Sequence, residues 1–163
     1  MARLIRQYGE LYERGAVSSE TLHKEMEKAA SLPLPFQKFL HAMSDIFQPK
    51  QPAIDIALAL KKKGHPLFVL SNTCEAHFLY LYNHFDFFKL FDGFVLSYEV
   101  QARKPEEKIF HKALEIASCS ASDCFYTDDV LDYVESAKTF GMDAEQFTTP
   151  SNLITHLSHR GFL

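Results

Sequence analysis

The stretch Leu67-Phe68-Val69-Leu70-Ser71-Asn72-Thr73 decides the fold of this chain. Its apolar half is rich enough in Phe and Val to predict a buried parallel strand over 66–70. Its polar half, Ser71 to Thr73, falls just past that strand. In an open parallel sheet, ligands bind beyond the carboxyl ends of the strands, where the connections diverge. The stretch therefore predicts an α/β fold with a polar site at the end of this strand.

Helix-like and strand-like segments alternate around this stretch. Residues 52–63 are apolar at helical spacing, and Gly64 follows where a C-terminal glycine is expected. Further strands are predicted over 93–96, 123–127 and 144–147, with helices over 75–84, 105–117 and 151–159 and another that ends at Phe140. Such alternation predicts right-handed crossovers onto a parallel sheet, a Rossmann-like arrangement flanked by helices.

The first third of the chain has a different, all-helical pattern. In the first helix, apolar residues recur at three- and four-residue steps, namely Leu4, Ile5, Tyr8, Leu11 and Tyr12. We expect this helix to end at Gly15, and Ser18 suits the N-cap of the next one. Prolines bound a third helix over 35–47. The sequence thus predicts two parts, a small helical unit over 1–50 and an α/β core over 51–163.

The composition is that of an ordinary soluble globular protein. The chain is 47% apolar and 23% charged, and its 163 residues suffice for a domain that buries about two-thirds of its unfolded surface. A net charge of −4 gives no basic surface for nucleic acid, and no apolar run approaches the ~20 residues of a membrane span. No secretory signal is recognisable, so the chain is expected to be cytoplasmic.

Cys74, Cys119 and Cys124 are odd in number and lack C-x-x-C spacing. This pattern argues against a zinc knuckle or a disulfide framework, so we interpret them as reduced thiols. Cys74 follows Thr73 directly and could face the polar site, although a packing role is the simpler interpretation.

Two adjacent carboxylates, Asp128 and Asp129, end the apolar run that begins at Cys124. Like charges packed together cost energy unless a cation or a basic group lies between them. Magnesium is the natural occupant, because it takes one or two carboxylates and completes its octahedron with phosphate oxygen and water. The alternative is that one carboxylate caps a helix while the other is solvated.

Ser71, Asn72 and Lys104 are candidates for binding a phosphate. A hydroxyl, backbone N–H groups and a helix N-terminus after Thr73 would favour an anion, although Ser71-Asn72-Thr73 could instead cap the following helix. Lys104 precedes Pro105 at a predicted helix start, where its ammonium could reach the phosphate as a point charge. The alternative for Lys104 is an ordinary solvated helix start.

Taken in order, three motifs resemble those of a known family. Leu70-Ser71-Asn72-Thr73, Arg103-Lys104-Pro105-Glu106 and Tyr126-Thr127-Asp128-Asp129 are similar to the second, third and fourth motifs of the haloacid dehalogenase superfamily. The likeness covers essentially the whole chain and is greatest for the branch with an N-terminal helical cap, which includes α-D-glucose-1-phosphate phosphatases. Gly15-Ala16-Val17-Ser18-Ser19-Glu20 resembles the start of a cap helix in that branch.

The resemblance implies a Mg²⁺-dependent phosphomonoesterase that acts on a small phosphorylated metabolite, with residues 1–50 as its cap. In the family, an aspartate on the first strand attacks phosphorus and forms a phospho-aspartate intermediate, and a second aspartate two residues later acts as acid and base. By this likeness, Ser71 and Lys104 would be catalytic and, with Asn72, would bind the phosphate. Asp129 would hold Mg²⁺, with Asp128 as a second ligand or beside it.

The sequence departs from the family pattern in two places. Val130 and Tyr133 stand where relatives carry polar residues after the aspartate pair, which would weaken a metal site. No Asp-x-Asp occurs in the 163 residues, so the family's first strand, central in its sheet, has no counterpart. Its absence would leave two buried strand edges unpaired, which is costly.

Three hypotheses about function follow. The first is a truncated phosphatase that is inactive because its nucleophile is missing. The second is a non-catalytic binding or regulatory module with the same fold, which Val130 and Tyr133 favour. The third is that another chain donates the missing strand and completes the site. The substrate is not indicated, because Phe36, Phe39 and Phe47 could line an apolar entrance but are explained equally well by helix packing.

Overall fold

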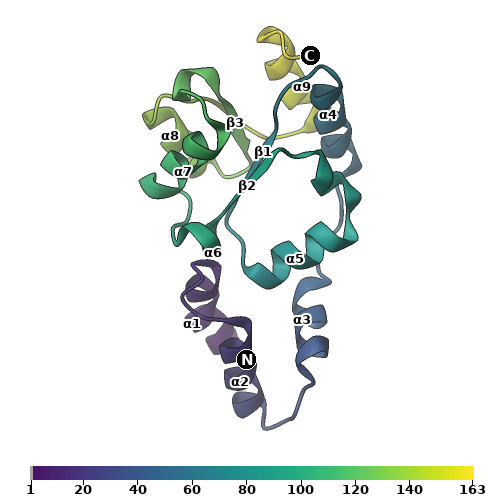
Figure 1. The fold of residues 1–163 in the computed structure, drawn as a ribbon, viewed down its shortest axis with the longest axis vertical. Coiled ribbons are helices and arrows are strands. Elements are labelled where there is room, and N and C mark those ends of the chain that lie inside the picture. The colour runs from purple at the N-terminus through teal and green to yellow at the C-terminus, as the bar shows by residue number, and fades with distance from the viewer. Residues whose placement is uncertain (1) are drawn as a thin grey trace.

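Helices and short strands alternate along the computed structural model, which describes residues 2–163, with side chains from Tyr8 onward (Figure 1). The α-helices are α1 (Ala2–Glu13), α2 (Ser19–Ala30), α3 (Phe36–Ser44), α4 (Gln51–Lys62), α5 (Glu75–His84), α6 (Ser97–Val100), α7 (Glu107–Ala117), α8 (Leu131–Thr139) and α9 (Pro150–His159). The strands are β1 (Phe68–Ser71), β2 (Gly93–Leu96), β3 (Phe125–Asp128) and β4 (Asp143–Gln146), and the short 3-10 helices are η1 (Asp86–Leu90) and η2 (Ala121–Asp123). The predicted α/β class is confirmed.

The strands of residues 2–163 form two parallel pairs. β1 pairs with β2, from Phe68 opposite Gly93 to Ser71 opposite Leu96. β3 pairs with β4, and no ladder joins the two pairs within the described residues. Parallel strands linked by helices are therefore as predicted, and they form two separate pairs within residues 2–163.

The prediction that the strand at Pro66–Leu70 is buried is wrong. Every residue of β1, and likewise of β3, is only partly buried. Both strands border a common cavity, so neither is covered along its whole length. In β2, by contrast, Val95 and Leu96 are buried.

Helices cover the strand pairs from two sides (Figure 1). α7 presents apolar residues three and four positions apart, and its Ile109 and Phe110 are fully buried. They belong to the larger apolar cluster, which joins α7 and α8 to β2 and β4. A smaller cluster joins α4 to α9 through Ile56, Leu153 and Leu157. The strand ends are thus positioned by helices on both sides.

The N-terminal helices α1, α2 and α3 lie together at one end of the molecule (Figure 1, purple to blue). Ser18 caps α2 as predicted, because its hydroxyl accepts a hydrogen bond from the Thr21 N–H at 3.2 Å. Their apolar cluster contains Tyr12, Leu22 and Phe39 and also buries Cys74, which precedes α5. Cys74 therefore has a packing role. Phe36 packs against the same cluster, so it and Phe39 serve helix packing.

Helix α7 begins at Glu107, and not at Pro105 as the sequence predicts. Glu106 is its N-cap residue, with an extended backbone (φ −64°, ψ 138°), and its carboxylate pairs with Arg14. Lys104 and Pro105 therefore lie in a turn ahead of the helix. The short elements η1 and α6 have no counterpart in the prediction, since each is too short to show a period.

None of the helices within residues 2–163 is both long and apolar enough to cross a bilayer. The three cysteines are free thiols, as the sequence indicates.

Candidate functional site

The ends of β1 and β3 meet at the ammonium group of Lys104. Its Nζ lies 3.0 Å from the carbonyl oxygen of Leu70, in β1, and 2.5 Å from Asp128 Oδ2, at the end of β3. The Lys104 and Asp128 side chains are 8% and 9% exposed. A lysine this buried is not a solvated helix start, so that alternative is wrong.

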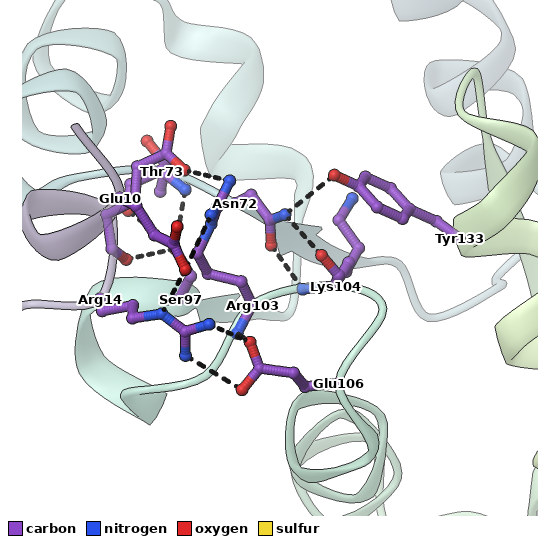
Figure 2. Close-up of polar contacts among 10 residues, drawn as sticks. Glu10, Arg14, Asn72, Thr73, Ser97, Arg103, Lys104, Glu106 and Tyr133 are labelled. Atoms are coloured by element: carbon purple, nitrogen blue, oxygen red, sulfur yellow. Dashed lines mark hydrogen bonds and ion pairs between the residues drawn. The ribbon is translucent and has the colours of Figure 1, made fainter. Parts of the chain in front are cut away.

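Asn72 holds the turn that carries Lys104 (Figure 2). Its Oδ1 accepts a hydrogen bond from the Lys104 backbone N–H at 2.8 Å, and its Nδ2 donates to the Lys104 carbonyl at 3.1 Å. An amide side chain that binds both backbone groups of one residue fixes that residue much as a neighbouring strand would. The ammonium of Lys104 is thereby aimed at the mouth between β1 and β3.

Ser71-Asn72-Thr73 does not cap the following helix. α5 has Cys74 as its N-cap residue, and no side chain caps it. Thr73 is buried, and its backbone N–H donates to Ser97 Oγ at 2.9 Å. Ser71 is the last residue of β1 and is half-buried there. The helix-cap alternative is therefore wrong, and Ser71 lies at a carboxyl strand end as expected.

Asp128 is held as an anion by several donors. Its Oδ2 accepts from Lys104 Nζ and from the Tyr126 hydroxyl at 2.7 Å, and its Oδ1 accepts from the Val130 N–H at 2.9 Å. Burial on its own raises the pKa of Asp128, but the hydrogen bond and charge of Lys104 outweigh it, so the pKa lies below its ordinary value. The pKa of Tyr126 is raised, mainly by burial and to a smaller extent by the hydrogen bond to Asp128. Tyr126 therefore remains a proton donor to this carboxylate.

Asp129 lies in a different environment from Asp128. Its side chain is exposed, and its backbone carbonyl accepts from Gln146 Nε2 at 2.8 Å. The basic group that offsets the paired carboxylates is thus Lys104, which binds only Asp128. Residues 2–163 contain no cluster of three or more His, Cys, Asp or Glu side chains arranged to hold a metal ion.

Sequence reasoning did not identify Tyr133 as part of the site, only as a departure from the family pattern. Its ring lies against the ammonium of Lys104, with 5.1 Å between Nζ and the ring centroid. Its hydroxyl accepts a hydrogen bond from Asn72 Nδ2 at 3.3 Å (Figure 2). An aromatic residue in the first turns of a helix is usually a packing residue, so only the structure shows this contact.

Ser97 is the second residue that sequence reasoning missed. It is fully buried, and besides the bond from Thr73 its Oγ donates to the Glu13 carbonyl at 2.6 Å. It connects the end of α1 to the loop after β1 (Figure 2). Its position directly after the strand predicted at 93–96 was the available signal, because polar residues at strand ends are site candidates.

Two parallel strand pairs are flanked by helices, with Asn72, Asp128 and Asp129 at the carboxyl ends of β1 and β3. The Lys104 side chain reaches these ends from the turn ahead of α7. This arrangement defines a Rossmann-like α/β protein with a polar site at the strand ends. The chain belongs to the haloacid dehalogenase-like hydrolase family, whose model matches residues 9–145.

Solved structures share this fold. A HAD family enzyme from Bacteroides thetaiotaomicron is 20% identical, with a TM-score of 0.79 over 89% of this chain and 74% of that one. A mutant of the same enzyme, in complex with magnesium and inorganic phosphate, is 19% identical, with a TM-score of 0.75 over 89% and 83% of the two chains. A predicted HAD-like family hydrolase from Porphyromonas gingivalis is 22% identical, with a TM-score of 0.70 over 90% and 76%.

Proposed function

We propose that this chain carries the phosphate-binding part of a Mg²⁺-dependent phosphomonoesterase whose substrates are small phosphorylated metabolites of the sugar-phosphate type. The observation that carries the proposal is the buried Lys104 ammonium beside Asp128, where β1 and β3 end. Membership of a hydrolase family and likeness to a structure that holds magnesium and phosphate support it. In this proposal, residues 1–50 are the cap and residues 51–163 the core.

Lys104 would neutralise the transferring phosphoryl group. A lysine ammonium has three N–H donors, and Leu70 and Asp128 accept from it in the present structure. A further donor can serve a phosphate oxygen, and low exposure makes that attraction stronger than it would be in water. Ser71 would donate its hydroxyl to the same group, and Asn72 would hold Lys104 and add a hydrogen bond.

Asp129 would be the main Mg²⁺ ligand, with Asp128 next to it. Carboxylate oxygens suit this hard cation, and an ion bound by one or two of them completes its coordination with water and phosphate oxygens. When bound, the ion would supply positive charge to the phosphate oxygens. Asp128 is already oriented by Val130 and Tyr126, so its role would be to fix Lys104.

The attacking carboxylate is not supplied by any residue identified at this site. The sequence contains no Asp-x-Asp, and Asp128 is committed to Lys104. Formation of a phospho-aspartate requires a carboxylate that can reach phosphorus in line with the leaving oxygen. We therefore expect the chain alone to bind phosphate without measurable hydrolysis. Another polypeptide that donates a strand with such a carboxylate would complete the site.

A second candidate function is a non-catalytic binding or regulatory module. Tyr133 favours it, because its ring covers one side of the Lys104 ammonium. Val130 also favours it, because it is 40% exposed next to Asp129 and offers no side-chain ligand atom. Such a module would keep the fold without binding Mg²⁺ and phosphate together.

Two measurements test the proposal. The chain alone should not release p-nitrophenol from p-nitrophenyl phosphate in the presence of Mg²⁺. Release should appear when an apolar strand ending in Asp-x-Asp is fused ahead of the chain. It should be lost again in the fused Lys104→Met variant. The melting temperature of the unfused chain should rise with Mg²⁺ and phosphate together, since both bind only the folded state. An unchanged melting temperature favours the module. If the unfused chain hydrolyses p-nitrophenyl phosphate and Asp129→Ala abolishes this activity, the claim that the chain lacks its attacking carboxylate is wrong.

A further inference from the structure

The thiols of Cys119 and Cys124 meet in the connection between α7 and β3 (Figure 1). Their Sγ atoms lie 2.6 Å apart, and both residues are partly buried. A disulfide bond is ~2.05 Å long, so the two sulfurs would have to approach by only about half an ångström to be bonded. The pair is therefore a candidate for a covalent modification that the phosphate site does not use.

Backbone hydrogen bonds hold both cysteines in place. The Cys119 N–H donates to the Leu114 carbonyl at 3.3 Å, at the end of α7, and the Cys124 N–H donates to the Ala121 carbonyl at 3.1 Å. The Cys124 carbonyl accepts from the Asp143 N–H at 3.2 Å, where β3 begins to pair with β4. The fold on both sides of the connection therefore sets the contact between the two thiols.

Cys119 is the thiol that a small reagent can reach. It lines an open hollow of about 550 Å³ between the last turn of α7 and η2. Cys124 lines instead the cavity beside β1 and β3, which Cys119 also borders. Burial, followed by the contact with Cys119, raises the pKa of Cys124 to about 12, so Cys124 keeps its proton near neutral pH. Because the thiolate is the reactive form, we expect Cys119 to react first.

We propose that Cys119 and Cys124 are a redox modification site that forms a reversible disulfide by exchange with a low-molecular-weight disulfide. In the first step, the Cys119 thiolate attacks one sulfur of the reagent, which gives a mixed disulfide and releases one thiolate. Cys124 then loses its proton to solvent and attacks the Cys119 sulfur, which forms the protein disulfide and releases the second thiolate. Two protein thiols are thereby oxidised, and one reagent disulfide is reduced to two thiols.

The new bond would join the end of α7 covalently to the start of β3. Its ring would span residues 119–124 and include η2. Because Cys119 faces the open hollow, a reducing thiol can reach the bond by the same route, so the modification is reversible. The proposal concerns the end of β3 that is opposite Asp128 and does not depend on phosphate or Mg²⁺.

Differential alkylation of the whole protein tests the proposal. The reduced protein is incubated with millimolar oxidised glutathione at pH 8, quenched in acid, unfolded and labelled with N-ethylmaleimide. Cys119 and Cys124 should lose their labels together, with a mass lower by two hydrogen atoms, and dithiothreitol should restore both labels. Cys74, which is buried in the apolar cluster of the N-terminal helices, should keep its label throughout and is the internal control.

The position of the bond can be read from fragments. Digestion ahead of Asp123 separates Cys119 from Cys124, so a disulfide between them links two fragments that reduction releases. Non-reducing electrophoresis should show a monomer, because the bond lies within one chain.

Single variants test the order of the two steps. In Cys124→Ser, Cys119 should stop at the mixed disulfide with glutathione, because the second thiol is missing. In Cys119→Ser, the mixed disulfide at Cys124 should form about tenfold more slowly than that at Cys119 in Cys124→Ser, since Cys124 lies away from the open hollow. Cys74→Ser is the matched control and should form the disulfide at the wild-type rate. A faster reaction at Cys124 than at Cys119 would overturn the assignment of the attacking thiol.

Three outcomes overturn the disulfide itself. The first is that both labels remain after incubation with millimolar oxidised glutathione. The second is that the wild type stops at the mixed disulfide, which would mean that the fold does not let the two sulfurs join. The third is a disulfide between two copies of the chain, seen as a dimer that dithiothreitol separates.

Discussion

Arg14, just after α1, and Glu106, the N-cap residue of α7, form a two-point ion pair. Arg14 Nη2 lies 2.5 Å from Glu106 Oε1, and Arg14 Nη1 lies 3.0 Å from Glu106 Oε2 (Figure 2). Glu106 Oε1 also accepts from the Arg103 N–H at 3.3 Å. The hydrogen bond from Arg14 outweighs burial and lowers the pKa of Glu106, so the carboxylate is charged at neutral pH. The pair therefore ties the N-terminal helices to the turn that carries Lys104.

Arg14→Met should loosen this tie. Because both side chains are partly exposed, we expect only a small fall in the free energy of unfolding. Arg14→Met should, however, speed amide hydrogen exchange more in α2 than in α8, because the lost pair joins the N-terminal helices to the rest of the molecule. Lys112→Met, which removes an exposed pair with Glu115 inside α7, is the matched control and should leave α2 unchanged. Equal exchange in α2 for both variants would mean that the pair does not hold the helices.

Gly15 is required where the N-terminal helices approach the core. Its φ is +67°, and an added Cβ would lie against the backbone carbonyl of Tyr98, far inside contact distance. We expect Gly15→Ala to lower the free energy of unfolding by about 2–4 kcal/mol, combining backbone strain with this clash. Gly64→Ala is the control, because Gly64 has φ +89° but open space around its Cβ position. Urea denaturation should show a smaller loss of unfolding free energy for Gly64→Ala than for Gly15→Ala. Equal losses would mean that backbone strain alone, and not the clash with Tyr98, explains the effect at Gly15.

Elements whose ends are marked in the sequence could be predicted. The strand at Gly93–Leu96 and the helix at Glu75–His84 have the predicted bounds, because apolar runs and flanking polar residues mark both ends. The helix expected at Pro105 begins instead at Glu107, and its N-cap residue, Glu106, pairs with Arg14, 92 positions away. No local pattern contains such a contact.

The residues of the candidate site were proposed from the sequence, whereas the contacts among them are known only from the structure. Strand ends are recognisable, so Ser71 and Asp128 were candidates from their positions, whereas Lys104 was a candidate from its predicted helix start. Lys104 binds Asp128, while Asp129 faces solvent. This difference depends on how β1 and β3 are placed relative to each other. Unpaired edges between the two strand pairs were expected from the family resemblance, because a sheet that lacks its central strand is divided there, and neither composition nor period reports this division.

The Cys124 thiol should react slowly. Its Sγ lies 2.6 Å from Cys119 Sγ, and burial, followed by the contact with Cys119, raises the pKa of Cys124 to about 12. Because the thiolate is the reactive form, alkylation of the reduced protein by iodoacetamide should be far slower than for an unstructured cysteine at pH 8. Cys119→Ser removes the neighbouring sulfur and should make Cys124 react faster. Mass spectrometry of digests measures both rates, and a Cys124 rate equal to that of a free thiol would contradict the raised pKa.

Asp128 should make the stability of the protein depend on pH in a specific window. Its folded-state pKa is below the ordinary value of 3.8, so the ionised carboxylate stabilises the folded state above that pH. This stabilisation is lost as the pH falls through the folded-state pKa. At pH 7, Asp128→Asn leaves the buried Lys104 ammonium without its anion and should cost about 3–5 kcal/mol.

The difference in unfolding free energy between wild type and Asp128→Asn should therefore be constant from pH 7 to about pH 5 and should shrink below pH 4. Other carboxylates are present in both proteins, so their titration cancels in the difference. Urea denaturation at each pH measures it. The double variant Lys104→Met/Asp128→Leu, which removes both charges, should be more stable at pH 7 than Asp128→Asn, because no unpaired buried charge remains. A difference that stays the same down to pH 3 would mean that Asp128 is not ionised against Lys104 in the folded protein.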